Sequence, residues 1–543
     1  MQGNSSMKRG SEAGAALAGL RSGGRQGRGP TRAAGLRAPL GAIAAALLAA
    51  GCSFAPVHER PVAPVAAEWR DAAAVQRAGA AAEAQAAAAA DIGWREFYPE
   101  PALQDLIARA LEHNRDLRMA VLNIEAARAQ YGIQRADRLP GIGAGASGSR
   151  QRVPADLSPS GSSRIAEQYD ATIGISAFEL DFFGRVRNLG EAALAEYLAT
   201  AEARRAAQIA LVSQVAGTWL NGLAAAEQLA LLDRTLQARE DSLRLIRLRY
   251  DGGAASELEV RQAEGLVESA RADRADAQRD RLQARNALEL LVGQPVDDAA
   301  LGAKPLAAVA LPRVPAAGLP SALLERRPDI LAAEERLRGA SASIGAARAA
   351  FFPRVTLTGA VGTASSELDG LFGGGSGIWS FLPRITLPIF DGGRNQAALD
   401  LAEVRKDLAV AGYEKTVQLA FREVADALAA RSTVGARLAA REAQAAAAAR
   451  SLELAELRYR GGVDSQLQWL DAQRSLLGAE QALLGARVAQ AANLVELYKV
   501  LGGGWLERGP GAGAAAGAPA AAGTKGAAVA PGGQGAASPG GAS

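Results

Sequence analysis

The sequence predicts an α+β membrane protein in which one unit, a pair of β-strands followed by a very long helix, occurs twice. An internal duplication supports this fold class, because residues 242–264 align without gaps on residues 451–473 with 11 of 23 positions identical. Each copy also contains segments in which apolar and polar residues alternate, followed by a proline-free helical stretch of about 65 residues. These observations predict four strands and two long helices per chain.

An export signal is expected ahead of the folded part. Residues 1–51 carry seven basic side chains and one acid, Glu12, and end in the apolar run 39–50. This run is shorter than the ~20 residues that span a bilayer, so it indicates a cleaved signal peptide over residues 1–51. Small residues precede Cys52, the only cysteine, as in the processing site of bacterial lipoproteins. We therefore expect a lipid on Cys52 and a lipid-anchored linker over residues 52–91.

The remaining composition argues against catalysis and against nucleic-acid binding. The formal net charge is +3, of which residues 1–51 supply +6, so the rest of the chain carries −3 and offers no concentrated basic face. With two histidines, His58 and His113, and one cysteine, the chain cannot assemble a metal site or an activated nucleophile from these residue types. We expect no enzyme activity, no metal and no cofactor other than the covalent lipid.

The first copy, residues 92–295, begins with a helical pattern and then changes period. Tyr169, Ile173 and Ile175 alternate with polar or small neighbours, which predicts a strand with one apolar face. Paired glycines after the long helix predict a tight turn. We expect the strand pair at about 139–182, the long helix at 186–250, the tip at 250–257 and a returning helix to 292.

The second copy, residues 321–502, follows a proline-containing insert at 296–320 and repeats this order. Val355, Leu357 and Val361 alternate with polar or small residues. We expect the second strand pair at about 353–391, the long helix at 394–459, the tip at 459–466 and a last helix to 501. Residues 503–543, rich in glycine, alanine and proline, are expected to be disordered.

The strands and the long helices together predict a barrel that several chains share. Strands of roughly ten residues can cross a bilayer when tilted, with one face toward lipid. Four strands cannot close on themselves, and each unpaired backbone group in hydrocarbon costs several kcal/mol. Helices of about 65 residues would be ~100 Å long, and charges along their whole length place them in water. The alternative is a soluble sheet beside a helical bundle.

One stretch of the second copy resembles a known family. Residues 326–353, RRPDILAAEERLRGASASIGAARAAFFP, are similar to the signature of outer membrane factors, the TolC-like channels, and in particular of their OprM/NodT lipoprotein branch. The tips LRYDGG and LRYRGGVDSQLQWLDAQRSLL, and Trp94 with Phe97, are also typical of this family. The resemblance implies a homotrimer that forms a 12-stranded barrel in the outer membrane, continued by a periplasmic α-helical barrel, with an equatorial girdle that includes the insert.

The resemblance also implies a function. Such proteins are passive exit ducts of tripartite efflux systems, so we expect export of drugs or other small molecules across the outer membrane. The expected partners are a periplasmic adaptor, an inner-membrane RND pump and outer-membrane lipid. Two alternatives are a TolC-like exit duct for type I protein secretion and a lipid-anchored coiled-coil scaffold without a pore.

The site residues that the resemblance implies lie at the two tips. Leu467 and Asp471 match residues that line the periplasmic constriction, although hairpin packing and a solvated helix charge also account for them. Arg458 and Tyr459 match residues that hold the helices closed, and Glu259 is expected to add acidity from the first tip. The adaptor is expected to dock on the tip loops, at Gly252, Gly253, Ala254, Ser256, Gly461, Gly462, Val463 and Ser465.

Overall fold

The computed structural model describes residues 53–66, 89–301, 304–310, 312 and 320–509. The expected signal peptide over residues 1–51 and the expected lipid on Cys52 therefore lie outside the described residues. So do residues 67–88 of the linker, much of the insert, and residues 510–543 of the tail.

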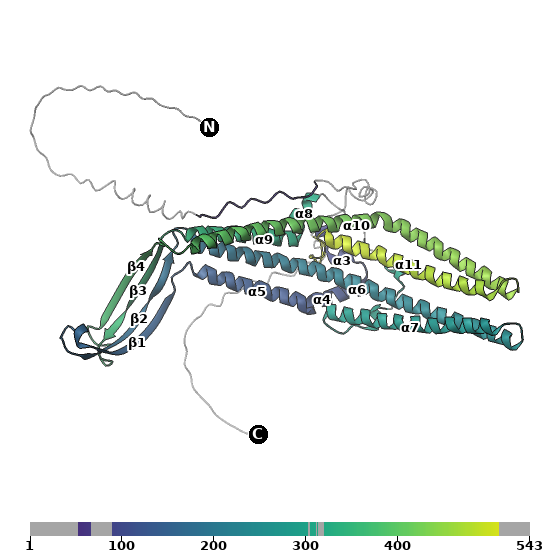
Figure 1. Cartoon of the computed structure of the whole chain (residues 1–543), viewed down its shortest axis with the longest axis horizontal. Helices are drawn as coiled ribbons and strands as arrows, with labels where there is room; N and C mark the ends of the chain where they lie inside the picture. The colour runs from purple at the N-terminus through teal and green to yellow at the C-terminus, as the bar shows by residue number, and fades with distance from the viewer. Residues whose placement is uncertain (1–52, 67–88, 302–303, 311, 313–319, 510–543) are drawn as a thin grey trace, which may run out of the picture. The chain divides into compact units, whose positions relative to one another are not determined.

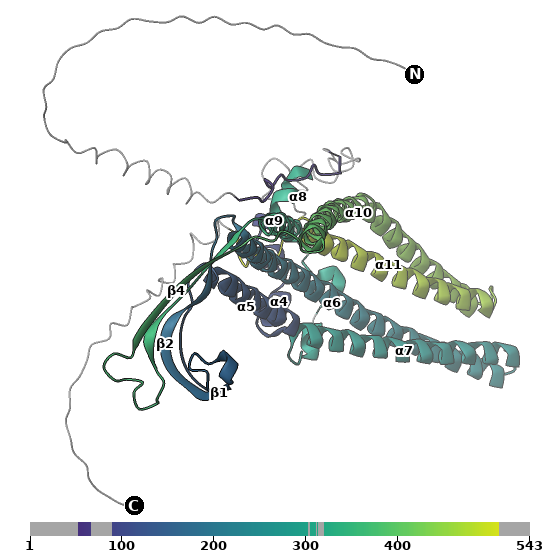
Figure 2. The ribbon, with the colours of Figure 1, turned by 60° about the vertical axis from the view of Figure 1, so that its left-hand side comes forward.

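Four antiparallel strands form one sheet in the order β1-β2-β3-β4 (Figure 2). β2 pairs with β3, so the strand pairs of the two copies join at the centre of the sheet. Within the described chain, β1 and β4 each have a neighbour on one side only, which leaves one edge of each strand open. The strands are Ile142–Val153 (β1), Arg164–Leu180 (β2), Arg354–Ser365 (β3) and Gly377–Thr386 (β4).

The register gathers apolar side chains on one face of the sheet. Ile173 lies opposite Val361, and Val361 lies opposite Trp379. Residues directly opposite each other on antiparallel strands point to the same face. These three side chains are 56, 63 and 79% exposed, so the face is not covered by other described parts of the chain. A continuous exposed apolar face on a sheet is typical of contact with lipid.

Two helices of 67 residues dominate the rest of the chain, α6 (Arg185–Asp251) and α10 (Arg394–Arg460). Each starts at a glycine in the left-handed region, Gly184 with φ 74° and Gly393 with φ 88°, a few residues after the preceding strand ends. A glycine can adopt this geometry without a Cβ penalty. A length of 67 residues corresponds to ~100 Å.

Shorter helices flank the long ones. Among them, α4 and α5 fall in a region with one continuous helical pattern, but the side chain of Asn114 accepts a hydrogen bond from the Leu117 N–H at 2.8 Å and starts a new helix. The elements are η1 (Ala89–Asp91), α3 (Trp94–Phe97), α4 (Pro101–His113), α5 (Arg115–Ala136), η2 (Ala155–Leu157), α7 (Glu257–Val292), η3 (Asp298–Leu301), η4 (Leu306–Ala308), α8 (Pro320–Arg326), α9 (Pro328–Ala349) and α11 (Gln466–Val500).

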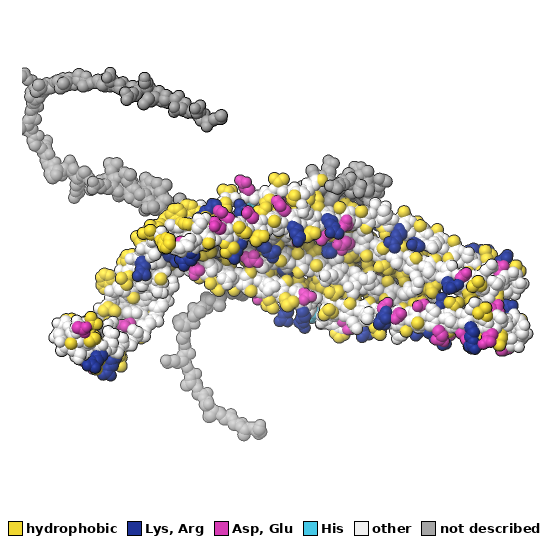
Figure 3. Space-filling model, in the orientation of Figure 1, with side chains coloured by type: hydrophobic (Ala, Val, Ile, Leu, Met, Phe, Trp, Pro, Cys, Tyr) yellow, Lys and Arg dark blue, Asp and Glu magenta, His cyan; other side chains and the backbone are white. Residues whose placement is uncertain are grey.

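The long helices pack as antiparallel hairpins, α6 with α7 and α10 with α11, while α6 and α10 both contact α9, and α6 also contacts α11 (Figure 1). Acidic and basic side chains are scattered along the helical surface between apolar ones (Figure 3). One described helix, α6, contains an 18-residue stretch apolar enough to cross a membrane by length and composition, half of it buried inside the chain. Because α6 also supplies Val215, Trp219 and Leu223 to the main helical core, we assign this stretch to packing between helices.

The first and the last elements of the folded part contact each other at the main helical core. Phe97 stacks on Tyr498 with ring centroids 3.8 Å apart, and the Trp94 N–H donates to the Leu506 carbonyl at 2.9 Å. Residues 503–509 are thus placed against the first helices, whereas we expected disorder from residue 503. The composition of residues 503–543 did not indicate this contact, because Trp505 and Leu506 are the only large apolar side chains at the start of a segment rich in glycine and alanine.

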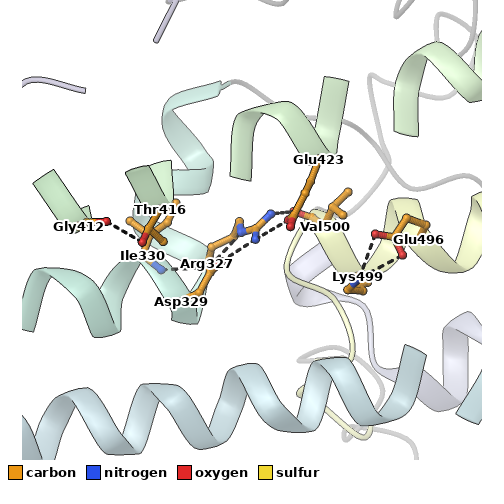
Figure 4. A network of polar contacts seen from close by, with 9 residues as sticks. All are labelled: Arg327, Asp329, Ile330, Gly412, Thr416, Glu423, Glu496, Lys499 and Val500. Carbon is orange, nitrogen blue, oxygen red and sulfur yellow. Dashed lines mark hydrogen bonds and ion pairs between the residues drawn. The ribbon is translucent and has the colours of Figure 1, made fainter. Parts of the chain in front are cut away.

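A buried arginine joins three helices near this core (Figure 4). Arg327, 9% exposed, precedes α9 and donates to Asp329 at 2.6 and 3.0 Å. It also donates to the Glu423 carboxylate on α10 at 2.8 Å and to the carbonyl of Val500 at the end of α11 at 3.0 Å. Because the guanidinium is planar with five donors, one side chain can satisfy all these acceptors.

Replacing this arginine tests its contribution to the fold. Arg327→Ala removes the guanidinium that serves two carboxylates and the Val500 carbonyl, so we expect a loss of about 2–3 kcal/mol of stability. The measurement is the midpoint of thermal unfolding in detergent at one fixed protein concentration. Arg422→Ala on α10 is the matched control, since Arg422 pairs with Asp426 on an exposed face and should cost below about 0.5 kcal/mol. Equal losses in both variants would contradict the role of Arg327.

Candidate functional site at the helical tips

Both hairpins turn through the same glycine geometry. Gly253 and Gly462 have φ angles of 73° and 72°, in the left-handed region that glycine adopts without a Cβ penalty. The next residue then donates back to the end of the long helix, from Ala254 at 2.7 Å and from Val463 at 2.9 Å. The two turns lie at the same end of the helices (Figure 1). The sequence repeat LRY-x-GG thus encodes two equivalent tips.

All eight loop residues expected to dock an adaptor are exposed. Val463 is 68% exposed and is the one large apolar side chain among them. The loops therefore present mostly backbone and small side chains to an incoming partner. This group comprises Gly252, Gly253, Ala254, Ser256, Gly461, Gly462, Val463 and Ser465.

Arg458 closes its own turn. Its guanidinium donates to both carboxylate oxygens of Asp464, from Nε at 2.6 Å and from Nη2 at 2.8 Å. These hydrogen bonds hold the pKa of the Asp464 carboxyl below its usual value. Since both residues belong to the second hairpin, the pair shapes this tip but does not join it to the first.

Tyr459 makes one of the contacts between the two hairpins near the tips. This ring is 3% exposed and stacks on Trp469, with centroids 5.0 Å apart. The guanidinium of Arg249, at the end of α6, lies over the same ring at 4.8 Å from its centroid. Burial raises the pKa of the Tyr459 hydroxyl. The ring is thus held between its own hairpin and a cation of the first hairpin, an arrangement that is favourable for an aromatic face.

Two glutamines also bridge the hairpins. Gln466, 2% exposed, donates to the Glu259 carbonyl at 3.1 Å, and Gln473 donates to the hydroxyl of Ser242 at 3.0 Å. Our sequence reasoning did not single out these residues, nor Trp469. A signal was present, because positions 466, 469 and 473 recur at helical spacing on the face of α11 opposite the expected gate.

The expected gate residues occupy the exposed face of α11. Leu467 is 55% exposed, and Asp471 follows one turn later on the same face with an ion pair to Arg474. An exposed leucine beside a charged pair is not explained by packing within one chain. The carboxylate of Glu259 is engaged differently: it accepts from the Ser256 N–H at 2.7 Å while the Ser256 hydroxyl accepts from Glu259 N–H at 3.3 Å. This reciprocal capping box starts α7.

No group of three or more histidine, cysteine, aspartate or glutamate side chains able to hold a metal ion occurs among the residues that the structure describes. The tips offer a set of contacts between helices: an aromatic sandwich at Tyr459, a buried glutamine bridge at Gln466, a half-buried one at Gln473 and an ion pair within the second turn. Such contacts can hold two hairpins together or release them, which is the physical requirement for a gate.

Comparison with known proteins identifies the family. The sequence model described as outer membrane efflux protein matches residues 106–294 and 319–503. The chain is 50% identical to outer membrane protein OprJ of Pseudomonas aeruginosa over 485 residues, which are 87% of this chain and 98% of that protein. It is 48% identical to the toluene efflux pump outer membrane protein TtgC of Pseudomonas putida over 465 residues, 85% of this chain and 95% of that protein.

Solved structures of related channels support the same family. A crystal structure of a membrane protein from Pseudomonas aeruginosa superimposes with a TM-score of 0.77 at 50% identity, covering 84% of this chain and 98% of that one. The open state of the MtrE outer membrane channel of Neisseria gonorrhoeae superimposes with a TM-score of 0.74 at 43% identity, covering 84% and 99%.

These likenesses confirm the expected fold class, in which a four-stranded sheet of the outer membrane continues into long helices. They also confirm that the protein is an efflux duct of the outer membrane and not an enzyme. The resemblance that rested on residues 326–353 and on the tips is therefore correct, and the chain belongs to the outer membrane efflux protein family.

Proposed function

We propose that three copies of this chain form a gated exit duct whose tips meet a periplasmic adaptor and an inner-membrane RND pump. The observation that carries the proposal is the sheet: its exposed apolar face, with Val361 and Trp379 in adjacent strands, ends in two open edges. In hydrocarbon these edges require partners. The β4 edge of one copy can pair with the β1 edge of the next, and repetition closes a ring.

The number three is what the resemblance to TolC-like channels implies, and the space that the ring encloses favours three copies over two. Two copies would give eight strands, and side chains fill the interior of such a barrel. Three copies give twelve strands and leave a lumen. In this ring α11 of each copy would contribute Leu467 and Asp471, forming an apolar constriction beside an acidic one. Water enters an apolar constriction reluctantly, and a ring of carboxylates favours cations over anions.

The cargo and the partners are proposed from the relatives. Curated relatives at 48% identity include a toluene efflux pump protein and an antibiotic efflux pump protein of Pseudomonas putida. We propose that this chain likewise exports small organic molecules, antibiotics and solvents among them. The exposed glycine-rich loops at both tips suit docking by backbone contacts. A lipid on Cys52 would attach the chain to the outer membrane in addition to the barrel.

Planar lipid bilayers provide the direct test. The purified protein should insert and conduct ions in discrete steps, with low open probability at neutral pH. Deleting the gene should lower resistance to antibiotics and solvents, and restoring the full chain should recover it. A scaffold without a pore predicts no conductance in any variant, and a protein-secretion duct predicts unchanged resistance with loss of a secreted protein.

The position of Arg249 over the Tyr459 ring leads to a specific prediction for the gate. Arg249→Ala removes an attraction between the hairpins of about 1 kcal/mol in every copy, so the ratio of open to closed channels should rise about fivefold for each copy that must separate its hairpins, which is on the order of 100-fold if all three copies open together. Single-channel recording measures this ratio. Arg244→Ala is the matched control, since Arg244 lies five residues earlier on α6, is exposed, and pairs with Asp241 of the same helix.

The same recording separates the two tip contacts. Arg458→Ala should open the channel less than Arg249→Ala does, because the Arg458 pair lies within one hairpin. An unchanged open probability in Arg249→Ala would contradict the assignment of the hairpin contact to Tyr459.

The proposed lipid and the proposed trimer can be tested separately. Cys52→Ser should abolish incorporation of radiolabelled palmitate, because no other cysteine is present in the sequence. The variant should still migrate as a trimer on native gels, since the barrel is closed by strand pairing. Migration of both proteins as monomers would contradict the shared barrel, and labelled Cys52→Ser would contradict the lipid site.

A further inference from the structure

A buried arginine without an acidic partner lies between the two helical hairpins. Arg239, on α6, is 5% exposed, and one of its terminal nitrogens donates to the Leu266 carbonyl of α7 at 2.9 Å. Its Nε is buried and has no hydrogen-bond partner. Among the described residues no carboxylate forms an ion pair with it. Buried cations in proteins are normally paired, because an unpaired one loses its hydration without compensation.

The charged groups near Arg239 do not supply the missing ion-pair partner. Burial lowers the pKa of the Arg239 guanidinium, Asp273 on α7 opposes this effect, and Arg474 on α11 adds to it. Asp273 is the acidic group whose charge reaches Arg239, yet it makes no ion pair with it. A second cation, Arg474, adds repulsion at Arg239 and is itself paired with Asp471 of the expected gate. These two cations and two acids balance in number, but among the described residues neither carboxylate forms an ion pair with the buried guanidinium of Arg239.

Arg239 also lines a cavity. The cavity has a volume of about 220 Å³ and lies between α6, α10 and α11, lined by Leu231, Arg234, Thr235, Ala238, Arg239, Leu452, Gln473, Leu476, Leu477 and Glu480. A water molecule occupies about 30 Å³ in the liquid, so there is room for a small anion and several waters. Apolar side chains form part of the wall, and low polarity strengthens any ion pair formed inside.

The polar lining of the cavity carries a net positive charge. Arg234 and Arg239 contribute two cations, and Glu480 contributes one carboxylate, but neither arginine forms an ion pair with it in the described structure. Thr235 uses its hydroxyl within α6, where it donates to the Leu231 carbonyl at 2.9 Å. Donors that can serve a ligand thus come from the two guanidinium groups, whose planar geometry suits carboxylate and phosphate oxygens.

We propose that this cavity between the hairpins is an anion-binding site, in which Arg239 and Arg234 bind a carboxylate or phosphate group. The acidic group can be a free small anion or an aspartate or glutamate side chain of a second copy. In either case it compensates the buried charge of Arg239. Both arginines lie on α6, and α10 and α11 of the other hairpin complete the wall of the cavity, so the bound group lies at the boundary between the two hairpins.

Binding to the purified full-length protein tests the proposal without any membrane. Inorganic phosphate and succinate are titrated calorimetrically at constant ionic strength against chloride. We expect saturable binding that Arg239→Gln weakens at least tenfold. Arg244→Gln on the exposed face of the same helix should bind as the wild type does. Arg234→Gln provides a second variant in case Arg239→Gln does not fold, and it should also weaken binding.

A crystal structure after soaking in selenate locates the group directly. Anomalous density within hydrogen-bonding distance of Arg239 supports the free-anion source. A carboxylate of a second copy on Arg239, together with no calorimetric binding, supports the second-copy source. An empty cavity without calorimetric binding overturns the proposal, as does binding that both Arg239→Gln and Arg234→Gln retain. Because no channel recording is involved, these outcomes are independent of whether the protein conducts.

Discussion

The structure depends on one constraint, the need of the backbone groups at a sheet edge for hydrogen-bond partners where water is absent. The sheet puts its apolar side chains on one exposed face, as Ile173, Val361 and Trp379 show, and lipid is the solvent that such a face fits. In lipid the open edges of β1 and β4 cannot remain unpaired. A chain with four strands is then incomplete alone, and the long helices that continue the strands must share its symmetry.

That continuity explains how the helices are stabilised. A helix of 67 residues cannot bury one face in a compact core, so its packing is divided into separate apolar clusters along its length. Leucine and valine make up most of these clusters, and the few alanines among them allow close approach of helices. Polar contacts hold the ends in place, as Arg327 does between α9, α10 and α11. The hairpins are thus firmly joined near the centre and more lightly joined at the tips.

Sequence periodicity predicted most of this fold. Strand alternation and proline-free helical stretches gave the elements within a few residues, because both patterns extend over many residues. Single-residue effects were not visible in the same way. Asn114 divides one helical pattern through a side-chain cap, and residues 503–509 contact Trp94 through backbone groups. Neither contact changes the pattern of apolar residues, so a pattern-based prediction cannot contain it.

At the tips, too, the sequence predicted which residues matter but not the contacts that each of them makes. Family resemblance predicted Arg458 and Tyr459, but whether a polar side chain points into its own turn or toward the other hairpin depends on tertiary packing. Arg458 does the former with Asp464, whereas Tyr459 is enclosed between Trp469 and Arg249. Gln466 is a polar residue whose burial could not be read from its type.

In the gate that we propose, this distribution indicates which contacts opening has to break. Separating the hairpins exposes the Tyr459 ring, removes it from Arg249, and leaves the buried amide of Gln466 without the Glu259 carbonyl. The Arg458 pair can survive that movement intact, since both of its members travel together. In this proposal the resistance to opening resides in the buried contact between the two copies of the repeat, and opening frees the second hairpin, which carries Leu467 and Asp471.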